Sequence, residues 1–223
     1  MRNKKDIFIG ILLICISGSI VRADVFDHPL EQGTMASFVS TTKQLAENPI
    51  VKGNFEQEKK ISSLGRSLKS SGNFIIALEP GMVWETLKPF PSTLALGKDF
   101  IVQSRPGGQK TAISAQGNET FIRLAEVMSA VFSGSTQKLM DNFEIYFHLI
   151  AIGTEPGSAW ELGLLPRDKA IASFASRITM KGDRAIRFIT INEQSGDSIS
   201  YILLNHSYPS ELAPHEKSLF TLP

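Results

Sequence analysis

The chain has 223 residues, of which 42% are apolar, and it carries 23 lysines and arginines against 22 aspartates and glutamates. This balance argues against nucleic acid as a partner, because nucleic-acid binding needs a basic stripe that releases counterions from the phosphates. It also argues against strong electrostatic docking on anionic lipid.

The first residues have the pattern of a secretory signal peptide. A basic segment precedes an apolar run over residues 7–20, and Ala23 closes a cleavage site. The run is about 14 residues long, whereas a membrane span needs roughly 18–20, so cleavage is favoured over retention as an anchor. Removal of residues 1–23 leaves 19 basic and 21 acidic residues. We therefore expect a protein exported to the periplasm, with a single domain over residues 24–223.

The single cysteine lies inside the apolar run. A lipoprotein signal needs a small residue before its cysteine, but Ile14 precedes Cys15 and the run continues beyond it. Cys15 is therefore expected to be removed with the signal peptide. The mature chain would then have no disulfide, no thiol nucleophile and no cysteine-bound metal, and its stability would depend on its core.

The first half of the mature chain is predicted to be one helix followed by strands. Residues 34–47 have helical spacing, with Thr34 as a cap and Asn48-Pro49 as the end. Apolar and polar residues then alternate, which is the pattern of strands with one apolar and one wet face. These strands are predicted over 51–58, 72–78, 82–87, 92–96 and 100–104.

The second half is predicted to begin with helices and to return to strands. An amphipathic helix is expected over 119–132 and a short one over 136–141. Another short helix should run from Pro166 to about Phe174, and the tail over 208–223, with three prolines, should be irregular. The strands of this half are predicted over 143–149, 160–164, 178–180, 186–188 and 199–205.

The short turns between these strands predict antiparallel neighbours, and a sheet of about ten strands must curl or close. The expected fold class is therefore α+β, dominated by a single curved antiparallel sheet.

Motifs for catalysis or for metal binding are not evident in the sequence. The four histidines lack metal-ligand spacing, and there is no Gly-x-Ser-x-Gly elbow or phosphate-binding glycine loop. His148 falls on the strand face opposite Ile145, so a solvent-side residue is favoured over a catalytic one. Glu56 and Glu58 are surrounded by lysines, which favours a solvated face over acid–base work. No cofactor or metal is expected.

Large apolar side chains dominate one face of the predicted strands and of the helix over 119–132. On the pattern alone an ordinary core is favoured, with a ligand cavity as the alternative. The side chains that would line such a cavity are Phe55, Phe74, Ile76, Met82, Trp84, Phe121, Leu124, Met128, Phe132, Ile145, Phe147, Trp160, Leu162 and Phe188.

Several segments in succession resemble the outer-membrane lipoprotein carrier (LolA-like) family, of which the chain would be a divergent member. They cover roughly residues 35–205, which is most of the mature chain. They are Phe55-Glu-Gln57-Glu-Lys59, Ser71-Gly72-x-Phe74 with Pro80-Gly81 and Trp84, Ser158-Ala-Trp160-Glu-Leu162 through Pro166 with Ile178 and Met180, and Glu193-Gln-Ser-Gly196-Asp197.

The resemblance implies an incomplete, half-open antiparallel β-barrel with helices packed in its concave side as a lid. It also implies that the side chains above line a hydrophobic cavity for the acyl chains of a lipoprotein or another lipid. The partners would then be an inner-membrane donor complex and an outer-membrane acceptor, and the carrier itself is expected to be a monomer.

One position departs from the family pattern. The lipoprotein carrier usually has an arginine just before the proline of the second hairpin, where it holds the lid, but this chain has Glu79. An ionised carboxylate cannot donate to lid carbonyls, so the same latch is not expected. Glu79 can equally be a solvated turn residue.

Three functions stay open at this stage. The first is a carrier of lipids or lipoproteins. The second is a non-transporting adaptor or sensor of the same fold, with a filled core and an envelope protein as its partner. The third, an enzyme acting on lipids, would need a nucleophile, a base and an oxyanion site, and the sequence presents no such set.

Overall fold

The computed structural model describes residues 24–97, 101–104, 110–113, 127, 129–152 and 155–221. The predicted signal peptide and most of the predicted helix over 119–132 lie outside these residues. The end of that helix is described, and residues 127 and 129–132 are helical as expected.

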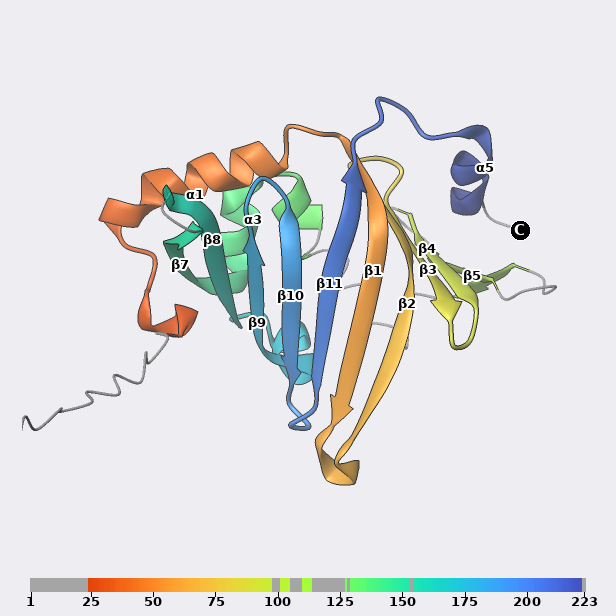
Figure 1. Cartoon of the computed structure of the whole chain (residues 1–223), viewed down its shortest axis with the longest axis horizontal. Helices are drawn as coiled ribbons and strands as arrows, with labels where there is room; N and C mark the ends of the chain where they lie inside the picture. Colours follow the sequence, from red (N-terminus) through yellow and green to blue (C-terminus); the bar gives the residue numbers. More distant parts are fainter. Residues whose placement is uncertain are drawn as a thin grey trace, which may run out of the picture.

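The described strands form a single antiparallel sheet of eleven strands in the order β6-β5-β4-β3-β2-β1-β11-β10-β9-β8-β7 (Figure 1). Two meanders, β1–β6 and β7–β11, are joined by the pairing of β1 with β11. The strands are β1 (Ile50–Ile61), β2 (Arg66–Ala77), β3 (Met82–Lys88), β4 (Ser92–Leu96), β5 (Ile101–Ser104), β6 (Thr111–Ile113), β7 (Phe143–Ile152), β8 (Glu155–Pro166), β9 (Ala175–Gly182), β10 (Ile186–Glu193) and β11 (Ser198–Ser207).

The sheet curls but does not close into a barrel, because β6 and β7 stay at its two ends without pairing among the described residues. The predicted fold class, an incomplete antiparallel barrel with helices on its concave side, is confirmed. Strong twist and curvature are what a sheet of this many strands requires.

Helices cover the concave side of the second meander. Helix α1 (Gln32–Leu45) runs across the upper ends of β7–β10, and α3 (Thr136–Asn142) and α4 (Lys169–Phe174) lie behind the strands in Figure 1. Their apolar faces join the inward side chains of the sheet in the main core. No helix among the described residues is both long and apolar enough to cross a bilayer.

Helix α1 begins two residues before the predicted start. Thr34 is not its cap: the cap is Glu31, and the Thr34 hydroxyl accepts a hydrogen bond from the Glu31 backbone N–H at 3.1 Å. Thr34 therefore holds the third position of a capping box rather than the first. The helix ends before Asn48-Pro49, as the sequence predicts.

The tail after β11 is more ordered than predicted and forms a second, smaller core on the convex side. It contains the short helices α5 (Pro214–Lys217) and η3 (Ser218–Phe220), with Pro214 in the first turn, where a missing N–H costs nothing. Leu212 and Phe220 pack on outward side chains of β2–β5, namely Ile75, Ala77, Val83, Ala95 and Val102. An ion pair between Lys52 and Glu216 also ties the tail to β1.

The segment before α1 covers the outer edge of β7. The Leu30 N–H donates to the Ile145 carbonyl and the Phe147 N–H donates to the His28 carbonyl, each at 2.9 Å. The 3-10 helix η1 (Val25–Asp27) then packs over Gly163 of β8, where a Cβ would lie 2.9 Å from the Phe26 ring. The free backbone groups of an edge strand are thereby partly satisfied.

Candidate functional site: an aromatic cluster on the concave face

Four aromatic side chains converge on the concave face of the first meander and of β11. We call Phe55, Phe74, Trp84 and Tyr201 the aromatic cluster. The Trp84 ring stacks on Phe55 with 4.2 Å between centroids and lies 6.0 Å from Phe74. Tyr201 meets Trp84 edge-on at 5.2 Å. These separations are within the range of attractive aromatic pairs.

Two glycines make room for these rings. Gly72 faces Phe55 in the β1–β2 register, and a Cβ on Gly72 would lie 3.0 Å from the Phe55 ring and 1.8 Å from the Glu85 carbonyl oxygen. Gly53 faces Phe74, and its Cβ would lie 2.8 Å from that ring. The bare backbone at these positions lets large rings lie flat across neighbouring strands.

Burial within the cluster is uneven. Phe55 and Phe74 are each 1% exposed, whereas Trp84 and Tyr201 are only partly buried. Burial, with a smaller effect from the carboxylate of Glu193, raises the pKa of the Tyr201 phenol above its ordinary value. Tyr201 therefore stays protonated and a hydrogen-bond donor at any physiological pH.

Polar side chains follow below the aromatic cluster, toward the β1–β2 hairpin. Gln57 is opposite Tyr201 in the β1–β11 register. Two residues further along β1, Lys59 donates to both carboxylate oxygens of Glu193, at 3.0 and 3.2 Å. Leu68, which faces Lys59 on β2, is 59% exposed, so this end of the concave face opens to solvent.

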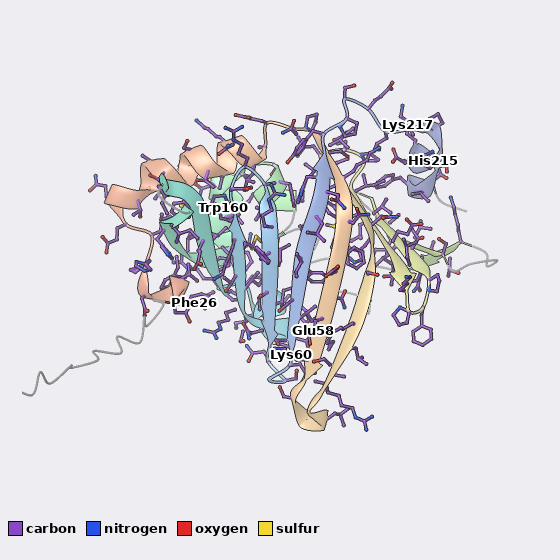
Figure 2. The ribbon with its side chains drawn as sticks, viewed as in Figure 1. Phe26, Glu58, Lys60, Trp160, His215 and Lys217 are labelled. Carbon is purple, nitrogen blue, oxygen red and sulfur yellow. The ribbon has the colours of Figure 1, made fainter. Side chains whose placement is uncertain are left out.

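The inward side chains of the second meander are buried in the main core. Four of the predicted site residues, Ile145, Phe147, Trp160 and Leu162, are buried there on β7 and β8. The Phe38 ring of α1 lies 5.6 Å from Phe147. Trp160, which Figure 2 places in the upper part of the sheet, donates from Nε1 to the Asp183 carbonyl at 2.6 Å.

Apart from Phe188, the other predicted site residues divide into two groups. Ile76, Met82 and Phe132 are buried in the main core, beside the residues above. Phe121, Leu124 and Met128 lie outside the described residues. Whether any of these side chains binds a ligand stays a prediction.

Phe188 is not on the concave face, which corrects the prediction from strand alternation. The β9–β10 register shifts between Ile186 and Phe188, so one extra residue inverts the alternation. Phe188 is consequently 48% exposed on the convex side, while Ile189 and Ile191 turn into the main core.

Tyr201 is the site residue that sequence reasoning missed. Its strand was predicted, and Tyr201 and Leu203 alternate with the exposed Ile202 and Leu204, so the parity that selected the other residues was available for it. The predicted lining, however, consisted of apolar side chains and tryptophans, and Tyr201 carries a polar hydroxyl.

The convex side of β1 and β2 has a shallow polar groove lined by Glu56, Glu58, Lys69 and Lys88 with neighbouring serines. Glu58 lies with Lys60 near the lower end of β1 (Figure 2). The carboxylates thus face lysines, in agreement with a solvated mixed-charge face.

The described residues hold no group of three or more His, Cys, Asp or Glu side chains that could bind a metal. The His148 ring lies 4.2 Å from that of His28 on the strand face away from the main core, between β7 and the N-terminal segment. Glu79 is exposed in the β2–β3 turn, and no hydrogen bond or ion pair joins it to the part of the chain that the structure describes.

No protein-family model and no curated protein matches the chain. Among solved structures, a DUF1329 family protein from Desulfovibrio piger is 10% identical with a TM-score of 0.46, and the match covers 79% of this chain and 92% of that one. A LolA superfamily protein from Nitrosomonas europaea is 8% identical with a TM-score of 0.45, covering 84% and 97%. The lipoprotein LppX from Mycobacterium tuberculosis is 11% identical with a TM-score of 0.43, covering 80% and 99%. All three matches are at low sequence identity and have TM-scores below 0.5.

Proposed function

We propose that the protein is a non-enzymatic periplasmic carrier that binds acyl chains, of lipoproteins or of another lipid, on its concave face. The aromatic cluster is the observation that supports this most. Trp84, at its centre, is only partly buried, while its neighbours Phe55 and Phe74 are 1% exposed. The partly exposed indole leaves an aromatic surface on the concave face that an acyl chain can contact.

The chemistry of the face suits an acyl chain. Each methylene removed from water contributes about 0.8 kcal/mol, and this gain needs no directional contact. A flat aromatic surface can therefore hold chains of different lengths without a dedicated contact for each carbon atom.

A carrier must also receive and release its cargo. The predicted signal peptide supports export, and transfer across the periplasm then requires an inner-membrane donor complex and an outer-membrane acceptor. Since helices cover the concave side of the second meander, we expect the cargo to enter and leave by their movement against the sheet.

The two tryptophans allow a direct test. A Trp160→Phe variant keeps Trp84 as the only tryptophan, and a Trp84→Phe variant keeps Trp160, so excitation selective for indole reports on one site at a time. A brominated fatty-acid methyl ester quenches an indole by contact, so the first variant should be quenched in a saturable manner and the second much less. Equal weak quenching of both variants would contradict binding at the cluster.

Native mass spectrometry of protein purified from the periplasm, with organic extraction, identifies the cargo. A bound acylated species that is lost in Trp84→Glu but kept in Phe188→Glu, a change on the convex side, supports the carrier. A clean unliganded mass for the wild type argues against it.

A second candidate, an adaptor that binds an envelope protein, is favoured by one observation. Phe188, Ile202 and Leu204 lie on adjacent strands of the convex side and are 48%, 37% and 38% exposed. A photo-crosslinking residue at position 188 that captures one periplasmic protein, together with a clean unliganded mass, would favour the adaptor over the carrier.

A further inference from the structure

We propose that the hydroxyl of Tyr201 is the polar end of the binding face and donates a hydrogen bond to the neutral carbonyl, ester or amide, of an acylated ligand. The inference rests on the proposed function and narrows its substrate class. It distinguishes esterified or amidated acyl chains from free fatty-acid anions.

Tyr201 lies where the apolar part of the concave face meets its polar part, and this position supports the role. On one side lie Phe55, Trp84 and Leu203, all apolar and in contact with the main core. Gln57 lies level with Tyr201, and the next position on the same face holds the Lys59–Glu193 pair beside Ile199 of β11. An amphiphile aligned with these strands would place its chain on the rings and its first polar atoms at Tyr201.

The phenol has unused hydrogen-bonding capacity. Among the described residues, no donor or acceptor is hydrogen-bonded to Tyr201 Oη, although Tyr201 packs against the main core. This hydroxyl is not among the buried side-chain atoms that lack a partner, so it is accessible from the concave face. A ligand carbonyl on the concave face would supply an acceptor that the described part of the protein does not.

The charges around Tyr201 select a neutral acceptor. Glu193 is near enough for its charge to raise the phenol pKa, and its side chain is only 10% exposed. Lys59 is already bonded to both oxygens of that carboxylate. Lys59 is therefore not free to pair with an incoming carboxylate, whereas an ester carbonyl carries no net charge and needs no such partner.

The shape of this end of the face agrees with a headgroup that stays near water. The β1–β2 hairpin continues beyond the helices, and Leu68 opposite Lys59 is 59% exposed. The backbone N–H of Gln194 donates to the Phe174 carbonyl of α4 at 3.0 Å, so α4 closes the face next to Glu193 on one side only.

Displacement of a fluorescent naphthylamine probe by methyl myristate and by pentadecane tests the hydrogen bond. Tyr201→Phe removes the hydroxyl and keeps the ring. It should lower the preference for the ester over the alkane by about three- to tenfold, the usual range for one hydrogen bond. Tyr208→Phe, at a tyrosine that is 45% exposed outside the cluster, is the matched control and should leave the preference unchanged.

A second variant tests the charge argument independently. Glu193→Gln leaves Lys59 without its partner and should raise the affinity for myristate relative to its methyl ester several-fold.

The outcomes separate the two proposals. An ester-to-alkane preference equal in wild type and Tyr201→Phe overturns the Tyr201 site while leaving the carrier in place. Wild-type protein that binds neither compound overturns both. Unchanged selectivity between myristate and its ester in Glu193→Gln contradicts the choice of a neutral headgroup.

Discussion

Trp84 on β3 stacks on Phe55 of β1 at 4.2 Å, although β2 lies between their strands. The contact crosses β2 at Gly72, which pairs with Phe55 on one side and with Thr86 on the other. The continuous aromatic surface of the concave face therefore depends on one residue without a side chain.

Gly72→Val should destabilise the protein by about 3 kcal/mol or more, in the upper range of overpacking substitutions. The new Cβ would lie 1.8 Å from the backbone oxygen of Glu85, which cannot move aside as a flexible side chain could. Urea unfolding measures the change. Gly33→Ala is the control, because Gly33 lies in the first turn of α1 with nothing within 4 Å of its Cβ position, and it should be neutral or slightly stabilising. A Gly72→Val protein as stable as the wild type would show that the sheet adjusts freely here.

Phe220→Ala should cost about 3 kcal/mol, as expected for a large buried ring. Phe220 is 6% exposed and covers outward side chains of the sheet such as Val83 and Val102. Differential scanning calorimetry reads the loss, with Tyr208→Ala, in an exposed part of the same tail, as the control. A loss no larger than the control's would mean that the tail contributes little to stability.

His206 should make stability fall as the pH drops below the ordinary histidine pKa of 6.5. Burial, and next the positive charge of Arg187, whose Nη1 lies 3.1 Å from His206 Nδ1, lower the pKa of this imidazole below its ordinary value of 6.5. The folded state thus disfavours the protonated ring, so the contribution is complete above pH 6.5 and is lost as the pH falls toward the lowered pKa.

The comparison that isolates this effect is His206→Asn against wild type, by urea unfolding at several pH values. The difference between the two proteins should shrink as the pH falls, because only the wild type loses the contribution of the neutral imidazole. A difference independent of pH would contradict the assignment. The His206 ring lies 5.7 Å from Phe74 of the aromatic cluster. Repeating the unfolding series with ligand present therefore also measures how ligand binding at the cluster depends on pH.

Strand positions were predictable because the alternation of apolar and polar residues is a local property of the sequence. Phe55, Phe74 and Trp84 were correctly assigned to one face from parity alone. The assignment of Phe188 was wrong because a bulge adds one residue, and no local pattern marks the bulge in advance. Tyr201 was missed because, although its position in the strand alternation places it on the concave face, its side chain is polar and the predicted lining was apolar.

The tail was not predictable for a different reason. Its prolines and polar residues have no periodicity, and its order comes from Leu212 and Phe220 meeting a sheet face made by β2–β5. That face exists only after the strands have paired, and tertiary contacts then override weak local preferences. The start of α1 differed by two residues for a local reason, because the Thr34 hydroxyl accepts from the Glu31 N–H and so lies inside the first turn rather than at the cap.

The pairing of β1 with β11 has a consequence for the order of folding. It joins positions about 150 residues apart, such as Phe55 and Leu203, and it is the link between the two meanders. Closing so large a loop is entropically expensive and slow compared with forming local hairpins. A chain that emerges from an export channel with its N-terminus first cannot make this link until β11 has emerged. For a chain exported in this way, as the predicted signal peptide would direct, the concave face with its aromatic cluster is completed only after β11 has emerged.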